Sequence, residues 1–180
     1  MLFRSTLTVT GEFSVTGIEA QGSVNLNKSM INVTSASKIP PASPGGITAD
    51  GILAQGSVTA TNSRINVTIV GTEIVPEALA RGISALEVVK INNSVVTATT
   101  NVEHGIARAV GIKGTTVIVN HANITVSAKG DTANVSGIFS PQSVTFKGNP
   151  SVVTAIHSGP GVLLPIESPI VNNNSAPKSQ

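Results

Sequence analysis

A unit that runs from Gly51 to Val67 constrains this chain most, because other stretches repeat it. The unit opens on Gly-Ile, places an apolar β-branched residue seven positions after the glycine and closes on Ser-x-Ile-x-Val. Progressively looser copies begin at Gly17, Gly82, Gly111 and Gly137, and the repeat length falls from 34 to 26 residues along the chain. Repeats of this length are typical of solenoids, in which each repeat forms one coil and buries its apolar side against its neighbours.

Apolar residues alternate with polar ones inside each repeat, and a period of two indicates strands. Pairs of apolar residues precede each glycine at positions −4 and −2: Phe13/Val15, Ile47/Ala49, Ala78/Ala80, Ala107/Ala109 and Ala133/Val135. Position +7 holds Val24, Val58, Val89, Ile118 and Val144. In the second repeat the pattern predicts strands over residues 47–53, 57–61 and 64–69. We expect Ile52, Val58, Ile65 and Val67 to point inward, and Thr59, Asn66 and Thr68 outward.

The residues between these strands favour parallel pairing. No two strands are joined by the Asn-Gly turn of a short hairpin. Tight turns are expected at Gly56 and Asn62, with equivalents at Gly22, Asn27, Asn93 and Asn123. The sequence therefore predicts an all-β fold, a parallel β-helix or β-solenoid of about five coils of 26–34 residues with three short strands each.

Repeat length varies mainly after the third strand of each coil. We expect variable loops at residues 38–45 and 71–77. Residues 76–81 have the composition of a single helical turn, but their alternation into Gly82-Ile83 favours a strand. The segment from Val162 to Ile166 is either one more strand or a cap.

The chain begins in the middle of a repeat, since Ser5-x-Leu7-x-Val9 matches Ser63-x-Ile65-x-Val67. We therefore expect it to be a piece of a longer protein. The predicted domain is a single solenoid over residues 1–168, with repeats near residues 17, 51, 82, 111 and 137. A polar, disordered tail is expected over residues 169–180.

Composition narrows the function classes. Only 2% of residues are aromatic and 11% are charged, and there is no cysteine, so the core must consist of small β-branched side chains. The net charge of +2 comes from scattered cations without interleaved aromatics, which argues against nucleic-acid binding. No apolar run approaches the ~20 residues of a membrane span.

No catalytic, cofactor-binding or metal-binding residues can be assigned from the sequence. Glu19, Asp50 and Glu87 occupy different repeat positions, so no outward column of acids is expected to support acid–base catalysis. The histidines, His104, His121 and His157, share neither a column nor a ligand spacing and are expected to be solvated. We therefore expect a protein that is not an enzyme and carries no cofactor.

Two polar motifs have ordinary structural explanations. Asn-x-Ser/Thr occurs at Asn27, Asn32, Asn66, Asn92, Asn123, Asn134 and Asn173. These would be glycan sites in a secreted eukaryotic protein, but outward polar strand residues are the favoured interpretation. Thr-x-Thr, the motif that ice-binding solenoids array on a flat face, occurs at Thr8/Thr10, Thr59/Thr61 and Thr97/Thr99. These pairs are expected to occupy different repeat positions and not to share one plane.

Several segments resemble the degenerate repeats of bacterial autotransporter passengers and filamentous-haemagglutinin-like adhesins. They are Ala80-Arg81-Gly82-Ile83, Val89-x-Ile91-Asn92-Asn93-Ser94 and Ala122-Asn123-Ile124-Thr125-Val126. The resemblance covers residues 5 to about 156. It implies a right-handed β-helix exported to the bacterial cell surface, where it acts as an adhesin, stalk or scaffold.

The favoured function is thus a non-enzymatic solenoid segment of a larger surface or secreted protein. Its expected partners are host-cell surfaces, extracellular matrix or glycans, and neighbouring coils of a longer chain. One alternative is a β-helix that binds or degrades polysaccharides, which a charged cluster on one face would favour. Another is an intracellular effector or phage-fibre segment built on the same solenoid.

Overall fold

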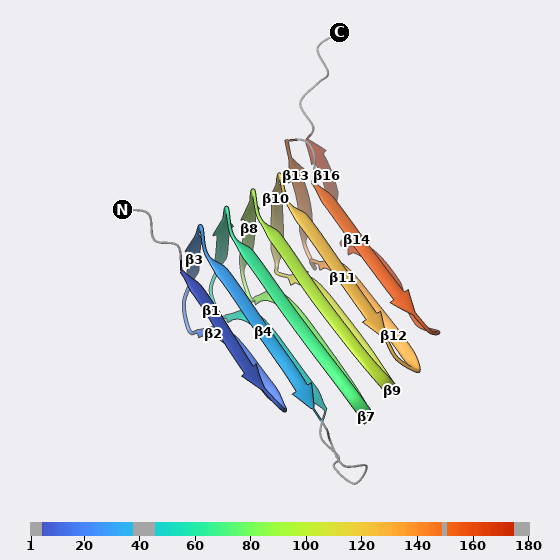
Figure 1. The fold of residues 1–180 in the computed structure, drawn as a ribbon. Helices are drawn as coiled ribbons and strands as arrows, with labels where there is room; N and C mark the ends of the chain where they lie inside the picture. Colours follow the sequence, from blue (N-terminus) through green and yellow to red (C-terminus); the bar gives the residue numbers. More distant parts are fainter. Residues whose placement is uncertain (1–4, 38–45, 149–150, 175–180) are drawn as a thin grey trace.

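The chain winds into a parallel β-solenoid, as the repeats predict (Figure 1). The structure is a computed structural model and describes residues 5–37, 46–148 and 151–174. Within these ranges every strand pairing is parallel and no helix is present. A helix long and apolar enough to cross a membrane is accordingly not found in this part of the chain.

The strands stack on three faces. Face 1 consists of β2 (Ser14–Ala20), β5 (Ile47–Ala54), the second part of β7 (Arg64–Ala85), the second part of β9 (Val95–Lys113), β12 (Thr132–Phe139) and β15 (Leu163–Glu167). Face 2 consists of β3 (Val24–Asn27), β6 (Val58–Thr61), β8 (Val88–Asn92), β10 (Thr116–Asn120), β13 (Ser143–Lys147) and β16 (Val171–Asn174). Face 3 consists of β1 (Thr6–Gly11), β4 (Met30–Ser37), the first parts of β7 and β9, β11 (Asn123–Lys129) and β14 (Val152–Ser158).

Faces 1 and 3 form one ten-stranded sheet, because β7 and β9 continue from one face into the other. The loop predicted at residues 71–77 is therefore wrong. This stretch stays in β7, and two register shifts, between Gly71 and Ile74 and between Val75 and Glu77, absorb the extra residues as bulges. Residues 76–81 are strand, as their alternation indicates. The other predicted loop, at 38–45, lies outside the described residues.

Inward-pointing side chains form columns that run along the solenoid. Ile52, Val58, Ile65 and Val67 are all fully buried, which confirms their predicted direction. Among the residues predicted to stack seven positions after each glycine, one is wrong. Val117, not Ile118, pairs with Val89 and Val144. The fourth coil reaches its second strand one residue early, which leaves Ile118 half-exposed on the outside.

A column of glycines brings face 1 close to face 3. A Cβ atom on Gly51 would lie 2.5 Å from the carbonyl oxygen of Gly82 and 2.6 Å from Cγ2 of Ile65. The same conflict with the next coil's backbone recurs at Gly17, Gly82 and Gly111. The Gly-Ile repeat therefore marks where the two sheet layers approach most closely, with no room for a side chain.

Tight turns between faces 2 and 3 use the left-handed backbone conformation once per coil. Asn62 and Asn93 have φ values of 50° and 46°, as their predicted turn role requires. The predictions for Asn27 and Asn123 are wrong. The turn positions in those coils are Lys28 (φ 52°) and His121 (φ 47°).

The solenoid extends further than predicted at its C-terminal end. Residues 163–167 form β15, so this segment is a strand. Strand β16 continues to Asn174 and pairs with β13, which contradicts a disordered tail from residue 169. Residues 175–180 lie outside the described part. The coil count therefore differs slightly from the predicted five, because each face contains six strands.

Candidate binding face

Face 3 presents two adjacent columns of small polar side chains, which we call the array. The first column contains Thr8, Asn32, Asn66, Thr97, Thr125 and Thr154. The second contains Thr10, Thr34, Thr68, Thr99, Ser127 and Ile156. Apart from Ile156 at one end, every member can donate or accept a hydrogen bond, and none carries a charge.

The array lies on a regular support. The strands beneath it, β4, β7, β9 and β11, pair without a register shift across the array, and they lie side by side in Figure 1. Strand spacing fixes a repeat of about 4.8 Å from coil to coil, and alternate residues along a strand lie roughly 6.6 Å apart. Face 3 therefore displays hydroxyl, amide and methyl groups on a two-dimensional grid.

Hydrogen bonds between neighbouring coils tie members of the array together. The amide of Asn66 donates to Oδ1 of Asn32 at 2.9 Å, and the hydroxyl of Ser127 donates to Oγ1 of Thr99 at 3.2 Å. Between the ends of the array these side chains are half-buried, because their neighbours flank them on the sheet. These four side chains consequently have less rotamer freedom to lose on binding than free ones.

The prediction that the Thr-x-Thr pairs do not share one plane is confirmed for Thr59/Thr61 and wrong for the other two pairs. Thr8/Thr10 and Thr97/Thr99 occupy the same two columns, whereas Thr59/Thr61 lies on face 2. The intervening coils carry Asn-x-Thr at 32–34 and 66–68, so a search for Thr-x-Thr alone misses the continuity. Matching Asn, Ser and Thr together in the repeat frame would have found it.

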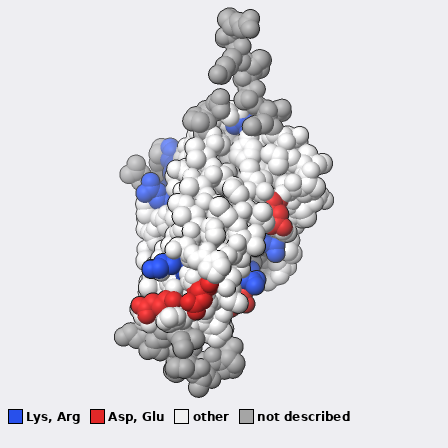
Figure 2. All heavy atoms as spheres, turned by 90° about the vertical axis from the view of Figure 1, so that its right-hand side faces the viewer, with Lys and Arg blue, Asp and Glu red and all other residues white. Residues whose placement is uncertain are grey.

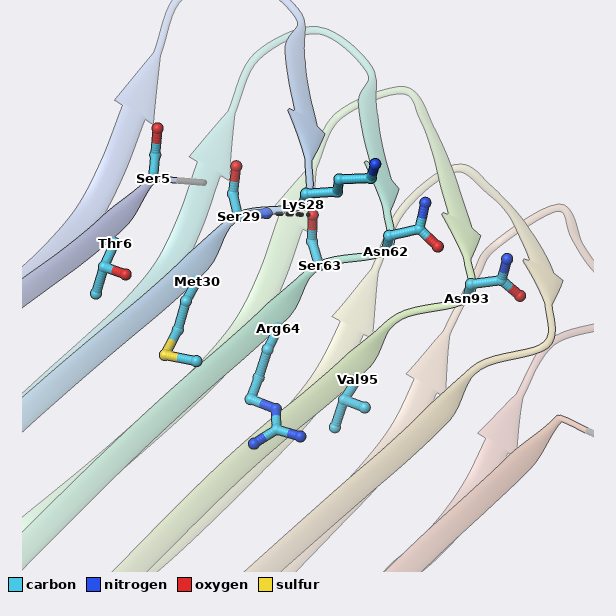
Figure 3. A pocket seen from close by; sticks show the side chains of 10 residues that line it. All are labelled: Ser5, Thr6, Lys28, Ser29, Met30, Asn62, Ser63, Arg64, Asn93 and Val95. Atoms are coloured by element: carbon cyan, nitrogen blue, oxygen red, sulfur yellow. Dashed lines mark hydrogen bonds between the residues drawn. The ribbon is translucent and has the colours of Figure 1, made fainter. Parts of the chain in front are cut away.

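A shallow groove runs along the corner between faces 2 and 3 (Figure 3). Lys28, Asn62 and Asn93 lie on one side of it, and Met30 and Arg64 on the other. Its floor is a ladder of serines at the turns. The backbone N–H of Ser29 donates to Oγ of Ser63 at 3.2 Å, and that of Ser63 donates to Oγ of Ser94 at 2.9 Å. These hydroxyls are committed to structural hydrogen bonds, so the floor of the groove has little free bonding capacity.

Charged side chains form isolated pairs. Arg81 donates from Nε and Nη2 to the buried Asp50 carboxylate at 2.5 and 2.7 Å. An exposed ion pair joins Arg108 to Glu77 at 3.2 Å, and Nδ1 of the exposed His104 lies 3.5 Å from Oδ1 of Asp131. The side of the molecule that faces right in Figure 1 is mostly uncharged, with its charges towards the margins (Figure 2).

Glu19, Asp50 and Glu87 do not share a column, as predicted. Asp50 lies beside Thr16 and Arg81, and Glu19 beside Leu53. Glu87 accepts a hydrogen bond from the Ser57 hydroxyl at 2.9 Å. Among the described residues no three His, Asp or Glu side chains gather as metal ligands would.

The three histidines lie apart, and one is not where the sequence suggests. His104 and His121 are exposed. His157, however, occupies an interior column of β14 beside Ala128, and its Nδ1 is buried without a hydrogen-bond partner among the described residues. A solvated turn histidine is therefore wrong for His157. Its position in an alternating run with Val153 and Ala155 is the signal that identifies it as inward.

The Asn-x-Ser/Thr asparagines have varied surroundings. Asn32 and Asn66 occupy the same outward column, as predicted. Oδ1 of Asn134 accepts the N–H of Val162 at 3.0 Å, which gives this side chain a structural role. Asn27, Asn92 and Asn123 lie at the ends of strands. The side chain of Asn173 is outside the described part.

Comparisons with protein-family models, with curated proteins and with solved structures find no match to this chain. The resemblance to autotransporter and haemagglutinin-like repeats therefore stays a prediction that rests on the sequence segments alone.

Proposed function

We propose that this chain is a non-enzymatic rod segment of a surface or secreted protein, an adhesin or structural scaffold, and that the array is its binding surface. The observation that carries the proposal is the continuity of the array, which is uncharged and crosses every strand of face 3. A rigid grid of weak hydrogen-bonding groups suits a partner that is itself extended and repetitive. Many weak contacts then add through multivalency.

The chemistry of the array favours some classes of partner over others. Its members are neutral, so highly charged partners gain nothing from it electrostatically. Matrix fibres, glycan layers and other regular surfaces outside the cell present repeated hydroxyl and amide groups. They therefore fit the array better than a small ligand, which would need a concave pocket.

A solid-phase binding assay tests this proposal. The purified chain is applied to matrix proteins, glycan arrays and insoluble polysaccharides, and compared with Thr68→Asp in the centre of the array. Thr59→Asp is the matched control, because Thr59 is also a half-buried outward threonine but lies on face 2. We expect Thr68→Asp to lose binding and Thr59→Asp to retain it. Equal binding by both variants would remove the array from the proposal.

A second candidate function is binding to ice, and the stacked Thr-x-Thr pairs favour it. Thr10, Thr34, Thr68 and Thr99 stack in adjacent coils, and so do Thr97, Thr125 and Thr154. Within these runs methyl and hydroxyl groups repeat at the strand spacing of about 4.8 Å. Water oxygens in ice repeat at a similar distance along one lattice direction. Slow growth of ice from a solution of the protein tests this: incorporation of the chain, but not of Thr68→Asp, would support it, and exclusion of both would reject it.

The same assay also tests the alternative that the chain binds or degrades polysaccharides. Sugar-binding faces commonly use aromatic side chains as platforms for the rings, and the array has none. Binding to insoluble polysaccharide that survives Thr68→Asp would place the sugar on another face. Release of soluble sugar from the polysaccharide would favour an enzyme instead.

A further inference from the structure

The two ends of the solenoid are complementary steps. Each face contains six strands, and the chain rises by one strand spacing per turn, so the first strand, β1 on face 3, lies outermost at one end and the last, β16 on face 2, lies outermost at the other. At one end β1 therefore projects beyond β2 and β3. At the other end β15 and β16 project beyond β14 and leave a recess of one strand on face 3. The projecting β1 of a second copy has the position and direction to fill that recess.

Continuing the observed register across such a junction extends each interior column with a similar side chain. On face 3, Val153 of one copy would meet Leu7 of the next, because both lie in the column of Ile31, Ile65, Val96 and Ile124. On face 1, Ile166 would meet Ile18, since both end a column of isoleucines. On face 2, Val171 would meet Val24.

Interior side chains at the two ends are less buried than their equivalents between them. Ile52, Ile83, Ile112 and Ile138 are fully buried, whereas Ile18 and Ile166 in the same column are only partly buried. Several large apolar residues are exposed at the ends, including Phe13 at 53% and Val171 at 49%. Strand edges that expose both apolar side chains and unpaired backbone groups favour pairing with another chain.

We propose that copies of this chain associate head to tail, with β14, β15 and β16 of one copy pairing in parallel with β1, β2 and β3 of the next. The contact is heterologous, so it leaves a free end on each copy and produces filaments. It repeats the contact that already joins successive coils within the chain. Along such a filament Thr154 would be followed by Thr8, so the array would continue from one copy into the next.

One charged pair opposes this association and supplies a test of the register. Glu19 and Glu167 are exposed and lie in the same outward column, so the junction would place them side by side. Like charges directly opposite each other on adjacent strands are destabilising. Replacing either glutamate by lysine would convert this repulsion into attraction, whereas replacing both would restore a like-charge pair.

The experiment measures molar mass by light scattering over a range of concentrations for the 180-residue chain, Glu19→Lys, Glu167→Lys and the double variant. We expect both single variants to form larger species at lower concentration than the unaltered chain, and the double variant to lose that gain. Circular dichroism confirms that all four proteins are folded. If both single variants keep the mass distribution of the unaltered chain, or if the double variant assembles as they do, the proposed junction is wrong.

Discussion

The backbone N–H of Ser63 donates a hydrogen bond to Oγ of Ser94 in the next coil, at 2.9 Å. The same Oγ donates to the carbonyl of Asn92 at 2.7 Å, two residues before it in its own turn. Each serine thus closes its own turn and accepts the N–H of the preceding coil. Ser94 is buried, so water cannot replace it.

Substituting Ser94 by alanine should therefore destabilise the solenoid by about 1–3 kcal/mol, the cost of leaving buried partners unsatisfied. Urea unfolding followed by circular dichroism measures the loss. Ala122 occupies the same turn position one coil later and interrupts the ladder. Ala122→Ser should consequently stabilise the protein by about 0.5–1.5 kcal/mol. A Ser94→Ala variant as stable as the original would show that the ladder contributes nothing.

Gly82→Ala should destabilise the protein strongly. A Cβ atom there would overlap Cγ1 of Val96 and lie 2.5 Å from the carbonyl oxygen of Gly111. Relief of the first contact requires faces 1 and 3 to separate, and relief of the second requires two neighbouring strands of face 1 to move apart, at a cost of roughly 1–3 kcal/mol or more.

Gly22→Ala is the control for that substitution, because a Cβ atom on Gly22 meets nothing within 4 Å. Its effect should stay within about 0.5 kcal/mol. The melting temperatures of Gly82→Ala and Gly22→Ala are compared, and we expect that of Gly82→Ala to be the lower. Similar temperatures would mean that the glycine column is not needed for close packing of faces 1 and 3.

The inward and outward faces of the strands were predictable because apolar and polar residues alternate with a period of two in every repeat. Ile52 and Val58 are inward for that reason alone. Predictions that counted from a glycine failed where a coil gained or lost a residue, as at Ile118. The bulges in residues 71–77 were hidden because an extended backbone can absorb extra residues without turn-forming side chains.

The array was missed for a different reason. Columns on a solenoid are defined by pairing between strands, and chemically similar residues substitute for one another along them. Asn66 replaces threonine between Thr8 and Thr97 without leaving the column. A search for a motif of identical residues cannot reveal such a column. The pairing register of neighbouring strands reveals it.

Val58→Asp should unfold the chain. Val58 is fully buried between Val24 and Val89, so the carboxylate would be desolvated without a partner at a cost of several kcal/mol. Thr59→Asp places the same charge on the outside next to Lys90 and should be tolerated. Far-ultraviolet circular dichroism and protease resistance distinguish the two, and equal stability would disprove the assigned register.

The buried ion pair between Asp50 and Arg81 should behave as one unit. Arg81→Ala alone leaves the carboxylate of Asp50 buried without its cation. Loss of one partner from a buried pair typically costs 3–5 kcal/mol, and we expect about 2–4 kcal/mol here because the Arg81 side chain remains 24% exposed. Asp50→Ala should cost less, because the guanidinium can turn towards solvent.

The double variant Asp50→Ala/Arg81→Ala provides the decisive measurement. If the carboxylate's lost partner causes most of the damage in Arg81→Ala, removing the carboxylate as well should restore part of the stability. The free energy of unfolding of the double variant should then exceed that of Arg81→Ala, and the two single effects should add to more than the double one. Strict additivity would show that the two residues contribute independently, and that Arg81 stabilises face 1 by covering its surface rather than by neutralising Asp50.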